Sequence, residues 1–248
     1  MSLASVLRPL VDLVLPPRCP GCGVLVDADL QFCSDCWNAL RFISDPACQS
    51  CGKPFAEGRD NDLICAECLA DPPQHDGIKA AVLYDDLSRS IVLKLKHGGK
   101  IGLARLIARQ LQRHLPGSSD HVVLIPVPLH RWRLWRRGFN QSILIARALA
   151  RERRLPVETD ILRRIRPTPP LKGMTRKQRG LAVRGVFDIP KDRREHIRGK
   201  HVLLIDDVYT TGATSKACVR LLKQAGAAKV TIFCWARVLR GGDEGSGM

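Results

Sequence analysis

Apolar residues follow two kinds of spacing along the chain, one typical of strands and one typical of helices. Segments of the two kinds alternate over much of the chain, which predicts strands separated by helices. Unbroken apolar runs are typical of strands that are buried on both faces of a mostly parallel sheet. The segments with strand patterns are Ile78–Tyr84, His121–Val127, Val157–Ile165, Val202–Ile205 and Lys229–Ala236. The segments with helical patterns are Leu87–Lys96, Ile101–Leu115, Gln141–Arg153 and Ser215–Gln224.

The first 17 residues are apolar but are interrupted by Arg8 and Asp12. They lack the basic start and the small-residue cleavage site of a signal peptide, so we expect a packed N-terminal helix over residues 1–17. No apolar run approaches the roughly 20 residues that a bilayer-spanning helix needs. We therefore expect a cytoplasmic protein without a membrane span.

Two segments have the composition of connections. Asp71–Gly77 contains two consecutive prolines and is a natural linker. Arg166–Phe187 is basic and holds three prolines, which predicts a long loop with one helical turn at about Thr175–Leu181. A long loop in a compact domain often acts as a lid. The tail at 241–248 is rich in glycine and is expected to be disordered.

Eight of the ten cysteines form four C-x-x-C pairs in the first 70 residues. In a chain without an export signal, such pairs indicate metal binding rather than disulfides. Gaps of 10 and 13 residues between successive pairs match two consecutive four-cysteine zinc ribbons over 18–71, each with a structural Zn²⁺, although pairing across the ribbons is also open. The predicted ligands are Cys19, Cys22, Cys33, Cys36, Cys48, Cys51, Cys65 and Cys68, whereas Cys218 and Cys234 are expected in the core.

Charge is distributed unevenly along the chain. The net charge is +16, but residues 18–76 carry −6 and residues 77–248 carry +22. A domain this basic is suited to polyanions, either nucleic acid or metabolites that carry pyrophosphate. A solvated basic surface is the alternative.

Eight arginines and one acid lie between Arg131 and Arg154, with aromatic residues among them. Guanidinium groups beside flat aromatic rings are typical of single-stranded nucleic-acid surfaces. Alternatively, Trp135 and Phe139 pack inward and the arginines form a solvated face. The candidate nucleic-acid residues are Arg131, Trp132, Trp135, Arg136, Arg147, Arg151 and Arg154.

The most specific pattern follows the apolar run Val202–Ile205. Two carboxylates come next, followed by a turn of threonines and glycine and then by a helix. Backbone N–H groups at a helix N-terminus bind phosphate, and two adjacent acids suit a sugar diol, directly or through a divalent cation. An ordinary strand–turn–helix corner is the alternative. The residues concerned are Asp206, Asp207, Thr210, Thr211, Gly212 and Thr214.

This pattern resembles the ribose-phosphate signature of type I phosphoribosyltransferases. In those enzymes the acids hold the ribose of phosphoribosyl pyrophosphate and the turn holds its 5-phosphate. The chain as a whole resembles the ComF family of double-zinc-ribbon, phosphoribosyltransferase-like proteins associated with natural competence. The matching segments are the two ribbons with the linker Pro72-Pro73, Leu95-Lys96, Pro126–Ser142 (PVPLHRWRLWRRGFNQS), Arg166–Thr168 and Ile205–Thr214 (IDDVYTTGAT).

The resemblance implies an α/β fold over 78–240, with a parallel-sheet core, helices on both faces and the double zinc ribbon before it. It also implies a site for phosphoribosyl pyrophosphate or a related sugar phosphate with Mg²⁺. Asp206 and Asp207 would be the catalytic residues, and Arg166–Arg184 the flexible hood, from which Arg176 or Arg179 would reach the pyrophosphate. The implied ligand-binding residues are Thr210, Thr211, Gly212, Ala213, Thr214, Lys96, Val127, Arg133, Arg137 and Arg179.

Two functions are compatible with these features. One is phosphoribosyl transfer, and the other is a non-catalytic accessory role in the uptake or processing of single-stranded DNA, in which the turn binds only a ligand or a 5′-phosphate. In either case we expect DNA to contact the basic core. The acidic ribbons are expected to dock on that core or on a protein partner such as a competence helicase.

Overall fold

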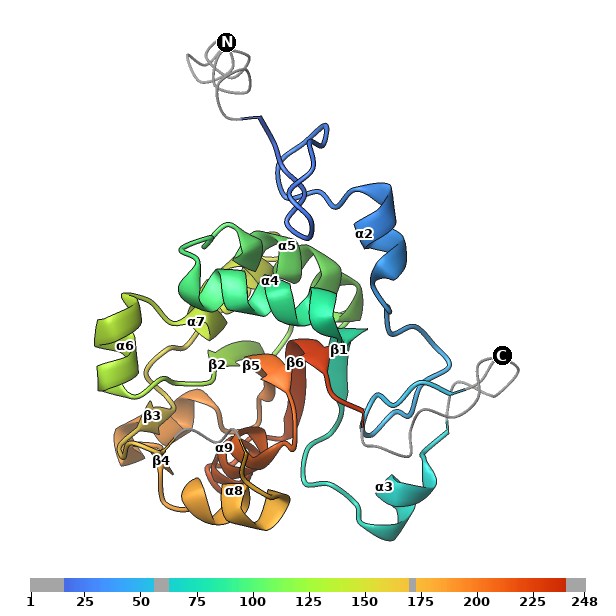
Figure 1. Ribbon diagram of the computed structural model, residues 1–248. Coiled ribbons are helices and arrows are strands. Elements are labelled where there is room, and N and C mark those ends of the chain that lie inside the picture. The colour runs from blue at the N-terminus through green and yellow to red at the C-terminus, as the bar shows by residue number, and fades with distance from the viewer. Residues whose placement is uncertain (1–15, 56–62, 170–172, 240–248) are drawn as a thin grey trace.

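The computed structural model describes residues 16–55, 63–169 and 173–239, with only the backbone of Arg176 (Figure 1). Nearly all of the expected N-terminal helix and the tail at 241–248 lie outside these residues. Within the described part of the chain, no helix combines the length and the hydrophobicity that crossing a bilayer requires.

Four strands form a parallel sheet, as the apolar runs predict. The strand order is β1-β6-β5-β2, and every neighbouring pair is parallel. Helices cover both faces of the sheet, so β6 is buried at every position after Lys229, and β5 is buried from Val202 to Ile205 and at Asp207. The strands are β1 (Ile78–Leu83), β2 (Val122–Pro126), β5 (His201–Tyr209) and β6 (Lys229–Arg237).

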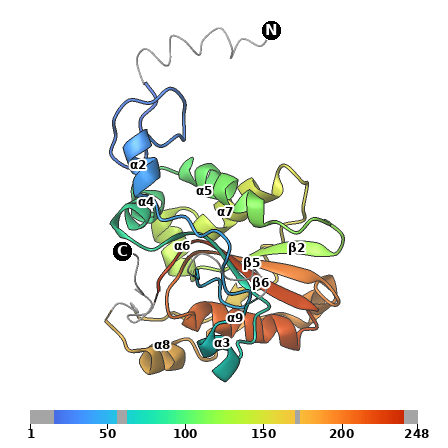
Figure 2. The ribbon, with the colours of Figure 1, turned by 90° about the vertical axis from the view of Figure 1, so that its right-hand side faces the viewer.

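Helices cover the two faces of the sheet in separate layers (Figures 1 and 2). Each layer buries its own apolar cluster against the sheet. The first layer consists of α4 (Asp86–His97), α5 (Leu103–Leu111), which continues into the 3-10 helix η1 (Gln112–His114), and α7 (Gln141–Ala150). The second consists of α9 (Ala213–Gln224), α8 (Arg176–Ala182), which packs on α9, and the 3-10 helix η2 (Lys191–His196).

Two irregular segments lie along the outer edges of the sheet. The chain between the ribbons pairs with β1, where Phe42 forms an antiparallel bridge with Val82. On the other edge, Leu124 of β2 bonds to Pro156 and Glu158 through its backbone N–H and C=O groups, both at 2.9 Å. These contacts satisfy edge groups that would otherwise be unpaired.

Several predicted boundaries were wrong. A strand over Val157–Ile165 does not form, because polar residues break the pairing after Glu158 and only the two-residue β3 (Arg163–Arg164) pairs with β4 (Phe187–Asp188). The helix predicted to begin at Ser215 begins at Ala213. The stretch after Pro128 contains an unpredicted helix, α6 (Arg131–Arg137).

The end of α7 also corrects a prediction. The helix stops at Ala150, and Arg154 has a left-handed backbone with φ of 51°. The candidate nucleic-acid residue Arg154 therefore lies outside the helical face that carries Arg147 and Arg151.

Both ribbons contact the basic domain through cations that bind ribbon carbonyl groups. Lys94 of α4 donates to the carbonyl groups of Pro20 and Gly21, at 2.5 and 2.7 Å. At the end of β6, Arg237 donates to the carbonyl of Cys51 in the second ribbon. The helices of the ribbons are α2 (Ser34–Ala39) and α3 (Ala66–Ala70).

Candidate functional site

Two clusters of four thiols form as the spacing predicts, and in the described part of the chain neither cluster takes a cysteine from the other ribbon. Within each cluster the sulfur atoms lie within 4.8 Å of one another, for example Cys22 and Cys33 at 3.6 Å and Cys51 and Cys65 at 3.7 Å. A Zn–S distance of about 2.3 Å in a tetrahedron places sulfurs about 3.8 Å apart. The thiols therefore fit tetrahedral zinc. The clusters are Cys19/Cys22/Cys33/Cys36 and Cys48/Cys51/Cys65/Cys68.

The backbone favours the thiolate form of one cysteine in each cluster. Burial raises the pKa of Cys19, but the N–H groups of Cys33, Cys22 and Gly21 point at its sulfur and hold the pKa at about 6. Cys48 is held at about 7 in the same way. Preformed thiolates are the form of cysteine that binds zinc.

The two neighbouring carboxylates belong to the end of β5 rather than to the turn after it. The predicted strand ended at Ile205, but pairing with β6 continues through Asp206 and Cys234 to Tyr209 and Arg237. Successive strand residues point to opposite sides, so Asp206 and Asp207 face different surroundings.

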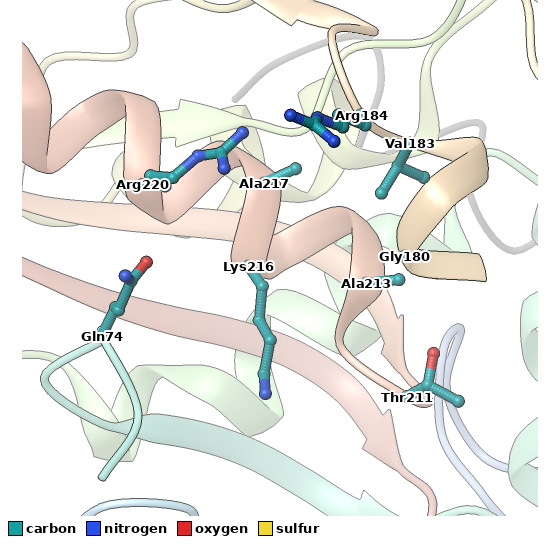
Figure 3. A pocket seen from close by; sticks show the side chains of 9 residues that line it. All are labelled: Gln74, Gly180, Val183, Arg184, Thr211, Ala213, Lys216, Ala217 and Arg220. Atoms are coloured by element: carbon teal, nitrogen blue, oxygen red, sulfur yellow. The ribbon is translucent and has the colours of Figure 1, made fainter. Parts of the chain in front are cut away.

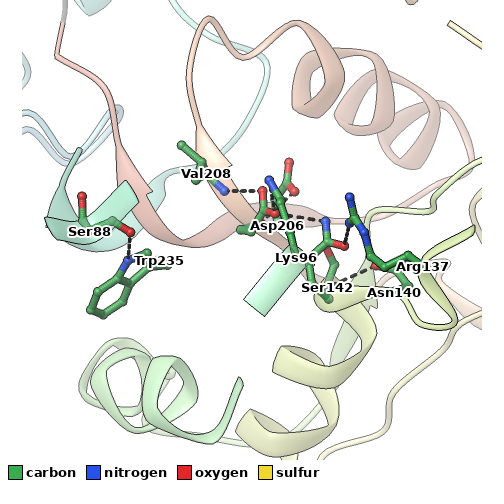
Figure 4. Close-up of polar contacts among 10 residues, drawn as sticks. Ser88, Lys96, Arg137, Asn140, Ser142, Asp206, Val208 and Trp235 are labelled. Carbon is green, nitrogen blue, oxygen red and sulfur yellow. Dashed lines mark hydrogen bonds and ion pairs between the residues drawn. The ribbon is translucent and has the colours of Figure 1, made fainter. Parts of the chain in front are cut away.

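Asp207 is buried and fully engaged. Figure 4 shows the surrounding polar contacts, with the side chain of Lys96 directed at the strand end that carries Asp206 and Val208. One oxygen accepts from the backbone N–H of Val208 at 2.8 Å. The other lies 2.5 Å from the Nζ atom of Lys96 and accepts from Gln141 Nε2 at 3.0 Å. Gln141 in turn accepts from Arg137 at 2.5 Å, so Asp207 is linked to cations on α4 and α6.

The carboxylate of Asp206 has most of its hydrogen-bonding capacity available for a ligand. Its one hydrogen bond with the described residues comes from the backbone N–H of Asp207, at 2.9 Å. Burial and then the charge of Asp207 raise the pKa of Asp206 to about 7, against the opposing effects of its backbone hydrogen bond, Lys96 and Arg164. Asp206 can therefore bind a hydroxyl group or a cation without breaking a protein contact.

The turn after β5 has the form of a phosphate site. Among the described residues, no protein acceptor binds the backbone N–H groups from Thr210 to Thr214. Gly212 has φ of 73°, and a side chain there would collide with the Tyr209 ring. The positive end of the 12-residue α9 lies at the same place, which favours an anion.

A basic cavity lies beside the carboxylates. It has a volume of about 450 Å³ and brings together the predicted cations Lys96, Arg133 and Arg137 with His97 and Arg136. Arg133 also donates to the carbonyl of Thr168 at 3.3 Å, which ties α6 to the start of the predicted hood.

A second cavity of about 450 Å³ separates the turn from α8 (Figure 3). Thr211 and Ala213 line it on one side, and Val183 and Arg184 line it on the other. The helical turn predicted for the hood is thus present as α8, next to the phosphate turn.

Two predicted ligand-binding residues have other contacts. The N–H of Val127 donates to Ile205 at 2.9 Å and its C=O accepts from Asn140 at 3.0 Å, so its backbone is already paired. Arg179 donates to the carbonyl of Met174 at 3.0 Å, within the hood itself. Neither residue lines the two cavities described above.

The predicted nucleic-acid residues fall into two groups. Trp132 and Trp135 on α6 are 66% and 79% exposed, so Trp135 does not pack inward. Phe139 does pack on the core, as the alternative interpretation predicted for it. Arg131 and Arg136 are exposed on the same helix, and Arg147 and Arg151 are exposed at the other end of α7.

Sequence reasoning missed Gln141 and Arg164. Gln141 stands directly after the N-cap of α7, where its neighbour Asn140 accepts from Ser142, and only the fold brings it to Asp207. Arg164 lies over the Phe187 ring at 5.3 Å and favours the charged form of Asp206. The sequence signal that could have predicted α6 was Gly138, which follows two arginines and ends the helix as its C-cap with φ of 80°.

Comparison with known proteins supports both halves of this architecture. Residues 10–69 match a model of the double zinc ribbon domain, and residues 140–245 match one of the phosphoribosyl transferase domain. The chain is 30% identical over 234 residues to the "DNA utilization protein YhgH" of Salmonella typhimurium, covering 92% of this chain and 100% of that protein.

Two further relatives carry names that refer to competence. "Competence protein F" of Haemophilus influenzae is 28% identical over 232 residues, with 89% of this chain and 96% of that protein covered. "Competence protein ComFC" of Bacillus subtilis is 27% identical over 222 residues, with 86% and 87% covered.

Proposed function

Because the chain belongs to the ComF family of double-zinc-ribbon, phosphoribosyltransferase-like proteins, we propose that it binds phosphoribosyl pyrophosphate or a related sugar phosphate at the end of β5. The observation that carries this proposal is the set of N–H groups from Thr210 to Thr214, which have no protein acceptor among the described residues, beside the available carboxylate of Asp206. A 5-phosphate would accept from those N–H groups, while Asp206 would accept from a ribose hydroxyl.

The basic cavity supports a pyrophosphate on the other side of the ribose. Lys96, Arg133 and Arg137 line it, and Lys96 is already beside the carboxylates. Mg²⁺ prefers oxygen ligands and would neutralise part of the pyrophosphate charge. Asp206 is the residue that fits this role, because the oxygens of Asp207 are engaged.

The same arrangement supports transfer chemistry if an acceptor reaches the anomeric carbon. The C–O bond to pyrophosphate would break with its electron pair on the leaving oxygen, and the acceptor would form the new bond. Cations at the leaving group and a carboxylate near the sugar ring would stabilise the charges that develop. We propose no acceptor, because the described residues include no evident base for one.

A specific observation also favours binding of single-stranded DNA. Trp132 and Trp135 are exposed among the arginines of α6, with ring centroids 5.8 Å apart. Exposed aromatic rings beside cations can stack on bases and contact phosphates. A cytoplasmic accessory protein that handles single-stranded DNA and holds a sugar phosphate or a 5′-phosphate in the turn is thus the second candidate function.

Calorimetry with phosphoribosyl pyrophosphate and Mg²⁺ tests the sugar-phosphate site. We expect binding by the wild type and loss of at least about tenfold in affinity for Asp206→Asn, since one charge-assisted contact contributes about 1.5–3 kcal/mol. Unchanged affinity in that variant would refute the assignment. Release of pyrophosphate with nucleobases or single-stranded DNA would then separate an enzyme from a binding protein.

A further inference from the structure

A groove runs between two helices on the side of the molecule away from the hood. Helices α5 and α7 pack side by side, and the groove between them has a volume of about 1000 Å³. Four arginines line it, and in each helix the two arginines are four residues apart, about 6 Å along the axis and on one side. They are Arg105 and Arg109 of α5 with Arg147 of α7 and Arg151, the C-cap of α7, whose backbone is still helical.

These arginines are free to bind an anion. All four are exposed, and none lies within 4 Å of a carboxylate in the described part of the chain. Two acids, Asp29 and Glu152, also line the groove, so its charge is positive overall. Alanine and leucine side chains form the surface between the helices, which leaves room for an extended ligand.

An aromatic side chain lies where the groove continues toward the first ribbon. A neighbouring hollow of about 870 Å³ shares Leu30 and Arg109 with the groove and is lined by Trp37. Trp37 is 46% exposed, and its ring rests against Phe42 with centroids 4.6 Å apart. One face of the indole is thus supported while the side chain remains accessible.

We propose that this groove binds a single strand of nucleic acid, with successive phosphates on the four arginines and a base stacked on Trp37. The proposal rests on the DNA-binding part of the proposed function and adds the α5–α7 surface to the contacts that are proposed there for α6. A single strand fits better than a duplex, because stacking on Trp37 requires an unpaired base. An acidic peptide is the competing partner, and it would gain little from the aromatic ring.

The test is fluorescence anisotropy with a labelled 20-nucleotide oligothymidylate and the full zinc-loaded chain, over a range of salt concentrations. Arg105→Glu with Arg109→Glu is expected to weaken binding at least tenfold. Loss of two phosphate contacts should also lower the slope of log affinity against log salt by about 1.4. Phosphoribosyl pyrophosphate binding, measured on the same protein, should not change.

A matched control has the same change in charge on the opposite face. Lys191→Glu with Arg194→Glu alters two exposed residues of η2, whose flanking residues Ile189 and Ile197 belong to the other apolar cluster. We expect less than a threefold effect on DNA binding. Equal losses of affinity in both double variants would show that DNA binding depends on the net charge of the protein and not on the groove, which would overturn the proposal.

The aromatic contact has a separate signature. Trp37→Leu removes stacking but no charge, so it should weaken oligothymidylate binding several-fold while the salt slope stays constant, with zinc content confirming an intact ribbon. Unchanged affinity would overturn the stacking contact. Competition by polyglutamate as effective as by unlabelled oligothymidylate would assign the groove to an acidic protein instead. Absence of DNA binding by the wild type would refute the DNA assignment while leaving the sugar-phosphate site testable by calorimetry.

Discussion

Asp206 and Asp207 are neighbours in sequence, but they have different partners and therefore different roles. Asp207 is held by Lys96 and Gln141, so it acts as a fixed counter-charge. Asp206 keeps an unused oxygen and has its pKa raised to about 7. Burying an incompletely paired carboxylate costs stability, which is a common property of binding sites.

Asp206→Asn should therefore stabilise the folded protein at alkaline pH. A carboxyl group whose pKa rises from 3.8 to about 7 on folding binds its proton more tightly in the folded state, so stability falls as pH rises between these values. The variant should match the wild type near pH 4 and melt several degrees higher at pH 8, at about 2–4 °C for each kcal/mol. Thermal melts at both pH values measure this, and a lower melting temperature at pH 8 would contradict it.

Gln141 is expected to matter for the pyrophosphate more than for the ribose phosphate. Gln141→Leu removes the contacts with both Arg137 and Asp207, so Arg137 loses its anchor at the basic cavity. We expect affinity for phosphoribosyl pyrophosphate to fall about tenfold or more, equivalent to about one or two hydrogen bonds, and affinity for ribose 5-phosphate to fall less.

The control for this change is Gln224→Leu, at the exposed end of α9. Calorimetry with both ligands gives the two ratios. Equal losses for the two ligands in Gln141→Leu would indicate a general disturbance of the site rather than a loss of orientation at Arg137.

At the scale of elements, the phosphate turn depends on one backbone conformation and one close approach. Gly212→Ala places a side chain at φ of 73° and against the Tyr209 ring. We expect a cost of about 1–2 kcal/mol from the left-handed backbone, further loss from the collision, and weak phosphate binding. Urea unfolding and calorimetry measure the two effects.

Gly199→Ala separates strain from collision. Its φ is 71°, but no atom of the described residues lies within 4 Å of the position that a side chain would take. It should show the backbone cost alone and bind ligand normally. If both variants lose the same stability and neither loses ligand, Tyr209 has no part in shaping the turn.

Sequence patterns predicted the elements whose formation depends on residues that are close together in the sequence. The strand Val122–Pro126 lies within its apolar run, and the capping pair Thr175 and Gln178 starts α8 within the expected helical turn. Patterns failed where tertiary contacts decide the outcome. The continuation of β5 through Asp206 requires pairing with β6, and the bond from Gln141 to Asp207 joins residues that are 66 positions apart.

At the scale of the whole molecule, the two ribbons have different relations to the site. The first contacts α4 through Lys94. The second contacts Arg237, which is paired in register with Tyr209 at the phosphate turn. Loss of the second zinc should therefore reach the turn, whereas loss of the first should not.

The variants Cys36→Ser and Cys68→Ser test this difference. Each removes one predicted zinc ligand, and the two cysteines are buried to nearly the same extent. Each should release one zinc per chain, because a structural site rarely survives loss of a thiolate. We expect only Cys68→Ser to weaken phosphoribosyl pyrophosphate binding, by several-fold. Zinc content and calorimetry check this, and equal effects of the two variants would count against a path through Arg237.

The segment that borders β1 has a consequence for how the protein assembles. Ile43 donates to Ala81 at 3.0 Å and Leu83 donates to Arg41 at 2.8 Å, so residues between the two zinc clusters occupy the free side of the outermost strand. In the intact chain, a partner or a second copy cannot extend the sheet there by strand addition. A fragment that begins at Ile78 would expose those backbone groups and is expected to self-associate. On this expectation, the segment between the two zinc clusters also protects that strand from aggregation.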